Sequence, residues 1–228
     1  MEARSSLKAA LLDFDGTLVD LPVDWDLLRE RISRTFATQG FDSEFRPLYV
    51  GIANAFADFE ARGVPPHTRA GLRRRLNRLM TEAELDVVAT AEALPGSREL
   101  LECCRERGWK TMIQTSNSLL AVRGVWARLG FPPVDAIIGR ESARRPKPHP
   151  QGVRSALRQF GLRGSEVIVV GDGDFDVELG RAIGARTVRV GSRHYPAGTG
   201  AEADIEVTSL QELTRLLAGR QELLGARV

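Results

Sequence analysis

The chain has 228 residues, with 32 basic and 30 acidic side chains and a formal net charge of +2. A charge this close to zero indicates no nucleic-acid partner, because binding to a phosphate backbone requires a strongly basic surface. The content of 43% hydrophobic and 27% charged residues excludes a disordered or fibrous chain. This length allows one well-packed core and a small second domain.

The sequence predicts a cytoplasmic protein with no membrane association. No apolar run approaches the roughly 18 residues of a membrane-spanning helix. Charged residues at Glu2, Lys8 and Asp13 argue against a secretory signal peptide. Cys103 and Cys104 are adjacent and cannot join distant segments, so the chain has no disulfide framework.

The first predicted element is a short buried strand over residues 7–12, followed by the sequence DFDGT. In an extended chain, residues i and i+2 point to the same side, so Asp13 and Asp15 present two carboxylates together. Gly16 permits a sharp turn after them. Two adjacent carboxylates repel, and the pair therefore needs a cation, a proton or both. This indicates chemistry on an anionic substrate such as phosphate, with a plain Asp-Gly turn as the alternative.

Between the first predicted strand and Ser97 the sequence predicts no strand, and residues 21–94 carry the signals of helices. Helix boundaries are marked by capping residues, glycines and prolines. The signals are an Asp24 cap with a stop at Gly40, a second helix ending near Gly63, a third opening at Pro65-Pro66, and a Thr81–Glu84 capping box for a fourth.

From residue 95 onward, strands and helices alternate. Strands are predicted at 111–115, 136–139, 167–171 and 187–190. Helices are predicted from a Ser97 cap to Arg107, from 119 to Gly130, from Pro150 to Gly161, and from a Ser209–Glu212 capping box through Leu217, with a loop over 191–204. This alternation predicts a Rossmann-like α/β fold, with a parallel sheet covered by helices on both faces.

Three predicted strands end in polar side chains, namely Asp13, Thr115 and Asp172. Parallel sheets of this kind bind ligands at the carboxyl ends of their strands. The topology therefore predicts one site that contains all three residues.

Four segments together resemble the motifs of the haloacid dehalogenase superfamily of phosphotransferases. They are DFDGTLVD at 13–20, MIQTSN at 112–117, PKPHP at 146–150 and VIVVGDGDFD at 167–176. The resemblance extends from about residue 7 to residue 217, and phosphoglycolate phosphatase-like enzymes are the nearest subgroup in layout. It implies an α/β core domain over 1–20 and 95–228, with a small α-helical cap domain over 21–94 inserted after the first strand.

The resemblance implies catalytic roles for the two acids of the first motif. Asp13 would be the nucleophile and form an aspartyl-phosphate, which divides hydrolysis into two easier steps. Asp15 would protonate the leaving oxygen and then activate water. Gly16 would lie beside the bound phosphate.

The second and third motifs would bind the phosphoryl group. Thr115 would donate a hydrogen bond through its hydroxyl, helped by the backbone N–H groups of Ser116 and Asn117, and a one-residue slip would give Ser116 this role. Lys147 would offset negative charge on the phosphoryl group and on Asp13.

The resemblance also implies a Mg²⁺ cofactor, which carboxylate and carbonyl oxygens suit. Its ligands would be Asp13, the backbone carbonyl of Asp15, and Asp172. Asp176 would act on the metal directly, through water or through Lys147. Asp174 is expected to cap the following helix, and a purely acidic helix start is the alternative for this segment.

These residues predict a Mg²⁺-dependent phosphatase that acts on a small phosphorylated metabolite, as a monomer or a dimer. A phosphomutase similar to beta-phosphoglucomutase would use the same site, and a non-catalytic phosphometabolite-binding protein is the third reading. A dehalogenase is disfavoured, because the acid at Asp15 serves phosphoester chemistry.

Overall fold

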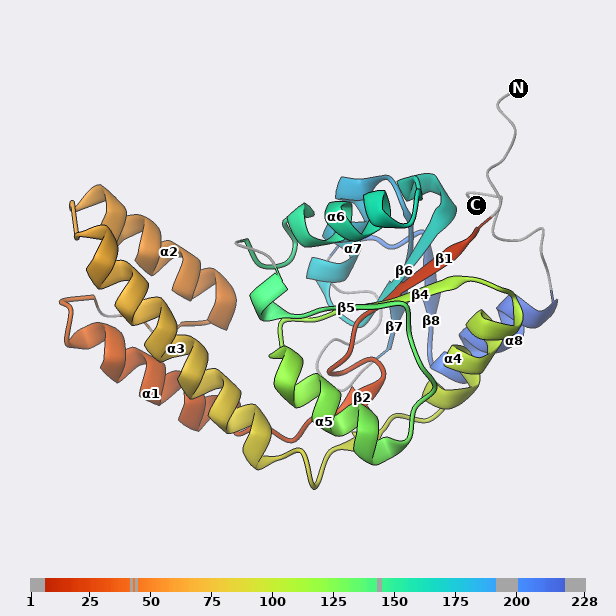
Figure 1. The fold of residues 1–228 in the computed structure, drawn as a ribbon, viewed down its shortest axis with the longest axis horizontal. Coiled ribbons are helices and arrows are strands. Elements are labelled where there is room, and N and C mark those ends of the chain that lie inside the picture. The colour runs from red at the N-terminus through yellow and green to blue at the C-terminus, as the bar shows by residue number, and fades with distance from the viewer. Residues whose placement is uncertain (1–6, 42, 44, 143–144, 192–200, 220–228) are drawn as a thin grey trace. The chain divides into compact units, whose positions relative to one another are not determined.

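A computed structural model describes residues 7–41, 43, 45–142, 145–191 and 201–219 (Figure 1). The chain divides into two compact units. We call Met1–Leu21 with Thr90–Val228 the core unit, and Pro22–Ala89 the helical unit. No helix among the described residues is long and apolar enough to span a membrane.

The described part of the core unit is built on a parallel sheet with strand order β5-β4-β1-β6-β7-β8. The strands are β1 (Ala9–Leu12), β4 (Lys110–Gln114), β5 (Ala136–Ile138), β6 (Val167–Gly171), β7 (Arg186–Val190) and β8 (Ile205–Val207). Every residue of β1 and β6 is buried, as expected for central strands covered on both faces. The predicted α/β fold class is confirmed.

Helices cover both faces of this sheet (Figure 1). They are α4 (Ser97–Glu106), α5 (Leu119–Leu129), α6 (Gln151–Gln159), α7 (Asp174–Ile183) and α8 (Leu210–Gly219), with short 3-10 turns at Arg140–Ser142 and Gly164–Glu166. Right-handed crossovers place α4 and α5 on one face, and α6 and α7 on the other, because the chain reverses direction across the sheet after β5. Helix α8 packs against α4.

The core unit also contains a small antiparallel pair, β2 (Val19–Asp20) with β3 (Glu92–Ala93). The prediction that no strand lies between the first strand and residue 97 is therefore wrong. Each of these strands has two residues, which is too short for a periodic pattern. In sequence, the pair lies immediately before and after the helical unit.

Within its described residues, the helical unit consists of α1 (Trp25–Ala37), α2 (Leu48–Ala61) and α3 (Pro66–Asp86). The predicted helix N-cap at Asp24 is confirmed, since its carboxylate accepts a hydrogen bond from the backbone N–H of Leu27 at 2.9 Å. The predicted fourth helix at Thr81 is wrong. Residues 72–86 contain no glycine or proline, so α3 continues through the apparent capping box.

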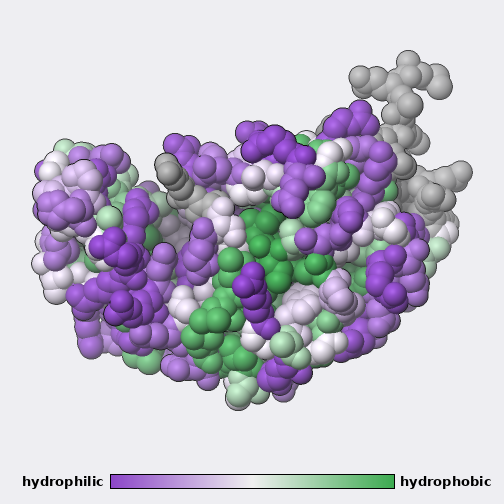
Figure 2. Space-filling view, viewed as in Figure 1, coloured by the Kyte–Doolittle hydropathy of each residue, from purple (hydrophilic) through white to green (hydrophobic). Residues whose placement is uncertain are grey.

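The helical unit has its own aromatic core. The ring of Phe36 lies 4.7 Å from that of Phe45 and 5.7 Å from those of Phe56 and Phe59, measured between centroids. Figure 2 shows that the outer surfaces of α1 and α3 in this view are mostly hydrophilic, whereas apolar surface gathers over α5 and β5. The aromatic core is therefore formed by the buried faces of α1 and α2, together with Phe45 from the segment between them.

The predicted cap at Ser97 is wrong in its detail. Gly96, with φ of 91°, is the N-cap, and Ser97 is the first residue of α4. The Ser97 hydroxyl instead contacts the carbonyls of Leu18 at 2.6 Å and Leu94 at 2.7 Å. Through its hydrogen bond to Leu18, this buried side chain connects the start of α4 with the turn that follows β1. The Ser209 cap is confirmed, because its hydroxyl accepts from the N–H of Glu212 at 3.2 Å.

Candidate active site

The sheet brings the ends of three strands together, as the sequence predicts. Strand β1 lies between β4 and β6, so Asp13, Thr115 and Asp172 follow three adjacent strands. The backbone continues the sheet hydrogen bonding into the site, since the N–H of Asp13 donates to Val170 at 2.8 Å. Asp13, the first residue after β1, is therefore held in place by hydrogen bonding to β6.

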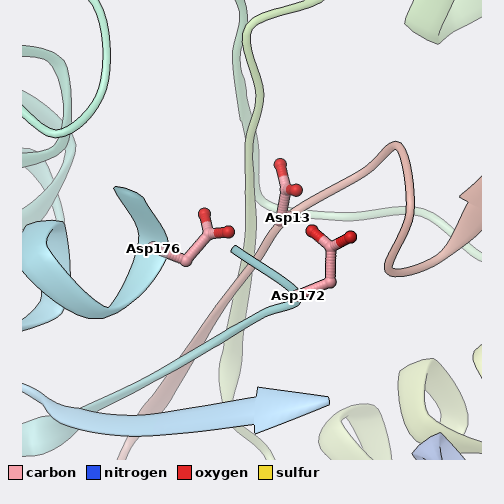
Figure 3. A group of neighbouring side chains, drawn as sticks. All are labelled: Asp13, Asp172 and Asp176. Carbon is pink, nitrogen blue, oxygen red and sulfur yellow. The ribbon is translucent and has the colours of Figure 1, made fainter. Parts of the chain in front are cut away.

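A buried acidic cluster lies at this edge of the sheet (Figure 3). Asp13, Asp172 and Asp176 each offer a carboxylate oxygen, and these oxygens lie within 4.8 Å of one another. The three residues are 8%, 5% and 5% exposed. Asp176 comes from the first turn of α7, where it also accepts from the N–H of Gly173 at 3.3 Å. We call these three residues the acidic cluster.

Two glycines allow the acidic cluster to form. A Cβ atom on Gly171 would lie 2.2 Å from Cγ of Asp176, and one on Gly16 would lie 2.5 Å from Oδ2 of Asp172. Gly16 also has φ of 82°, a conformation that side chains disfavour. The predicted sharp turn is present, and it brings the backbone against the acidic cluster.

Lys147 joins two members of the acidic cluster. Its Nζ donates to Oδ1 of Asp13 at 2.6 Å and to Oδ1 of Asp176 at 2.7 Å. Burial would lower the pKa of Lys147, but the two carboxylates outweigh burial and raise the pKa above its usual value. The ammonium group therefore stays protonated.

The electrostatics of Asp13 show that one ammonium group does not balance the acidic cluster. Burial and the neighbouring Asp176 raise the pKa of Asp13 well above its usual value, although Lys147 acts in the opposite direction. Three ionised carboxylates and one ammonium group leave a net charge of −2, which is costly in a buried site. The donor set therefore fits a divalent cation with oxygen ligands.

Asp15 lies apart from the acidic cluster, although it is only two residues from Asp13. Its Oδ1 accepts a hydrogen bond from the backbone N–H of Leu21 at 3.1 Å. The carboxylate is half-buried. The turn after β1 thus gives the two acids of the first motif different surroundings.

The loop after β4 is closed by an internal pair of hydrogen bonds. The Thr115 hydroxyl donates to Oδ1 of Asn117 at 2.6 Å and accepts from its backbone N–H at 3.1 Å. Ser116 is half-buried, and its carbonyl accepts from the Arg140 guanidinium at 3.0 Å. The three predicted phosphate-binding residues therefore form one compact loop, which Arg140 supports from the end of β5.

Arg140 and Arg189 are two residues that the motifs do not include. Arg189 on β7 is 1% exposed, and its Nη2 donates to Oδ1 of Asp174 at 2.7 Å. The predicted capping role of Asp174 is wrong, because Gly173 is the N-cap and Asp174 is the first helical residue. A charged residue between Val188 and Val190, in a stretch predicted as a buried strand, was the one signal in the sequence for this contact.

The structure thus combines a parallel α/β core with a lysine-linked acidic cluster at the ends of its strands. Residues 7–184 match the haloacid dehalogenase-like hydrolase family, and the chain belongs to that family. The predicted superfamily is confirmed.

Curated relatives carry the names of phosphatases. The chain is 27% identical over 207 residues to phosphoglycolate phosphatase of Rhodospirillum rubrum, covering 86% of each protein. It is 26% identical over 212 residues to N-acetylmuramic acid 6-phosphate phosphatase of Pseudomonas aeruginosa, covering 89% of this chain and 92% of that protein.

The solved structures show the same fold. CbbY from Rhodobacter sphaeroides, in complex with phosphate, has a TM-score of 0.65 at 23% identity, covering 91% of this chain and 96% of that one. At this level of identity the likeness describes the architecture of the chain and not its substrate.

Proposed function

We propose that this protein is a Mg²⁺-dependent phosphatase that hydrolyses a small phosphomonoester through an aspartyl-phosphate. The observation that carries the proposal is the position of Lys147, hydrogen-bonded to both Asp13 and Asp176 within the acidic cluster. An ammonium group beside two carboxylates can offset the charge of a phosphoryl group in the same place. The phosphatase names of the relatives support this reaction class.

Asp13 has one oxygen suited to nucleophilic attack. Lys147 holds Oδ1, which leaves Oδ2 to form the bond to phosphorus while the bond to the leaving oxygen breaks. Asp15 gives its proton to that oxygen and takes a proton from the attacking water in the second step. Cleavage of the bond between phosphorus and Oδ2 then releases inorganic phosphate and restores Asp13.

The acidic cluster, with the backbone carbonyl of Asp15, would hold the cation. When bound, Mg²⁺ would supply positive charge to the phosphoryl oxygens and the carboxylates. Thr115, with the backbone N–H groups of Ser116 and Asn117, would bind the phosphoryl oxygens, and Gly16 would leave room beside them. Phosphate binding would take the hydroxyl of Thr115 away from Oδ1 of Asn117, its partner in the structure.

The substrate class is a small phosphorylated metabolite. The relatives' names include phosphoglycolate and a sugar 6-phosphate, which share the phosphomonoester and differ in the leaving group. We assign the choice of leaving group to the helical unit, acting as a cap domain. Two unpaired cysteines and a metabolite substrate suit the reducing cytoplasm.

The test is phosphate release from a panel containing phosphoglycolate, sugar phosphates and nucleoside monophosphates, with Mg²⁺ or with EDTA. Wild-type protein should release phosphate only with Mg²⁺, and Asp13→Asn should abolish release. Asp58→Asn, which removes a surface carboxylate of the helical unit, is the matched control and should retain activity. Acid-quenched wild-type protein should carry covalent phosphate that Asp13→Asn lacks.

Two results would contradict the proposal. Folded wild-type protein that releases no phosphate from any compound would exclude a phosphatase of this substrate class. Transfer of the phosphoryl group to a second hydroxyl of a sugar phosphate, without release, would identify a phosphomutase instead.

A further inference from the structure

Arg189 places a buried positive charge next to the backbone of Asp172, a member of the acidic cluster. Its side chain is 1% exposed, in the middle of the otherwise uncharged run of residues 187–190 on β7. Burying a guanidinium group is costly unless its donors are paired, and an apolar side chain would fill this position without that cost. The contacts of Arg189 therefore need an explanation beyond the packing of the sheet.

The two terminal nitrogens of Arg189 hydrogen-bond to the segment that carries Asp172, while its Nε lies 3.8 Å from Oε1 of Glu206 on β8. Nη1 donates to the backbone carbonyl of Asp172 at 3.3 Å, and Nη2 donates to Oδ1 of Asp174 at 2.7 Å. Nη2 also donates to the carbonyl of Ala201 at 2.5 Å, while the N–H of Ala201 donates to the same Asp174 oxygen at 2.8 Å.

This network fixes the backbone of a very short connection. Only Asp172 and Gly173 separate the last residue of β6 from the first residue of α7. The Asp172 carboxylate also lies so close to Gly16 that a Cβ there would approach its Oδ2 to 2.5 Å. A small movement of this connection would therefore change the position of one carboxylate relative to the other two.

We propose that Arg189 is a positioning residue for the divalent-cation site, acting through the backbone of Asp172 and the side chain of Asp174. The inference rests on the proposed function in so far as that function gives the acidic cluster its cation. Arg189 touches neither the cation nor the substrate. Groups that orient metal ligands in this way typically contribute about 10–100-fold to metal affinity.

The direction in which Mg²⁺ affinity changes when Arg189 is removed distinguishes a positioning role from a purely electrostatic one. A guanidinium group near the acidic cluster repels a cation, so a purely electrostatic role predicts that its removal raises Mg²⁺ affinity. A positioning role predicts the opposite change. A role confined to the stability of the fold predicts a lower unfolding temperature and an unchanged affinity.

The test is calorimetric titration of Mg²⁺ into the folded protein without substrate, together with thermal unfolding in EDTA. Arg189→Met should weaken Mg²⁺ binding by about 10–100-fold. Arg189→Lys keeps the charge with fewer hydrogen-bond donors, so its Mg²⁺ affinity should lie between those of the wild type and Arg189→Met. Arg186→Met is the matched control, because it places the same substitution on the same strand at the end away from the acidic cluster, and its affinity should equal that of the wild type.

Asp174→Asn provides a second variant, in case Arg189→Met does not fold. It keeps the size of the side chain, removes the charge that Arg189 contacts, and should also weaken Mg²⁺ binding. Unchanged or tighter Mg²⁺ binding in the folded Arg189→Met protein, or unchanged binding in Asp174→Asn where only that variant folds, would overturn the inference.

The same titration separates this inference from the proposed function. Weaker Mg²⁺ binding in Arg189→Met, from a wild type that binds Mg²⁺ but releases no phosphate, would support the positioning role and refute the phosphatase. A wild type that binds no Mg²⁺ would overturn both.

Discussion

Replacement of Lys147 by methionine tests the electrostatic account of the site most directly. Methionine keeps a long apolar stem but removes the ammonium group that contacts Asp13 at 2.6 Å and Asp176 at 2.7 Å. All three side chains are less than 10% exposed, so water cannot replace the lost partner. The variant would keep a buried acidic cluster with no opposite charge from the protein.

The expected loss of stability can be worked out from these contacts. Removing one partner of a buried ion pair costs about 3–5 kcal/mol. In a chain of this size, 1 kcal/mol shifts the unfolding temperature by about 2–4 °C, so the temperature measured in EDTA should fall by about 6–20 °C. Mg²⁺ should restore a large part of this loss, because a cation replaces the missing positive charge.

The stability lost in Lys147→Met should depend on pH. Burial and Asp176 already raise the pKa of Asp13 in the wild type, and removal of Lys147 should raise it further. A carboxyl group whose pKa is raised by folding binds its proton more tightly in the folded state, so the stability of the variant should fall as pH rises above about 4. Acidic buffer should therefore narrow the difference between Lys147→Met and the wild type.

Lys110→Met is the matched control. Lys110 contacts Asp135 at 2.7 Å, but the two side chains are 50% and 27% exposed. Such a surface pair contributes about 0–1 kcal/mol, which corresponds to at most about 4 °C. The reasoning is refuted if Lys147→Met unfolds in EDTA at the same temperature as Lys110→Met, or shows no dependence on pH.

Three further changes test other parts of the structure. Glu166→Gln should reduce stability to urea at neutral pH, because Lys8 and other hydrogen-bond donors lower the pKa of Glu166 to about 2. This loss of stability should vanish as the pH falls from 4.5 to about 2, and a loss that stays constant with pH would contradict the reasoning. Iodoacetamide at pH 8 should modify Cys103 before Cys104, whose buried thiol has a pKa raised to about 12; equal labelling by mass spectrometry would argue otherwise. Gly16→Ala should abolish phosphate release, because its methyl group would lie 2.5 Å from a carboxylate oxygen of the acidic cluster; full activity would show that this turn can move.

The sequence predicts the sheet well where burial is continuous. Strands β1, β4, β6 and β7 are each buried over at least four consecutive residues, and a polar residue or a glycine follows each of them. Strand β8 has three residues, and β2 and β3 have two each, so their pairing depends on contacts between distant segments. Strand β5 is as short as β8, but its three residues are all apolar, whereas β8 has a glutamate at its centre and gives no apolar run.

The wrong capping predictions share one physical cause. Thr81, Ser97 and Asp174 are residue types that favour helix starts, but each has a better use in the folded chain. Thr81 lies within an unbroken helical run, Ser97 contacts the carbonyl of Leu18, and Asp174 accepts from Arg189. Local propensity therefore gave way to tertiary contacts at Ser97 and Asp174, and to the continuing helix α3 at Thr81.

The candidate site was visible in the sequence because its residues lie at the ends of strong elements, while the pairing among them was not. Asp176 was expected near the metal or near Lys147, and the structure places it in both the acidic cluster and the hydrogen bond to Lys147. The supporting contacts of Arg140 and Arg189 join residues that are far apart in sequence or lie outside any motif. Such partners become identifiable only when the topology is known.

The turn after β1 shows how two neighbouring acids come to differ. Asp13 continues the strand and is held by the N–H bond to Val170, which keeps its carboxylate in the acidic cluster beside Lys147. Gly16 then reverses the chain, and the N–H of Leu21 holds the carboxylate of Asp15 outside that cluster. The proposed reaction needs such a difference, because the nucleophile must be fixed against the phosphoryl group while the other acid gives and takes a proton. The division of roles that we propose, with Asp13 as nucleophile and Asp15 as proton donor, therefore rests on a difference in surroundings that a single turn produces.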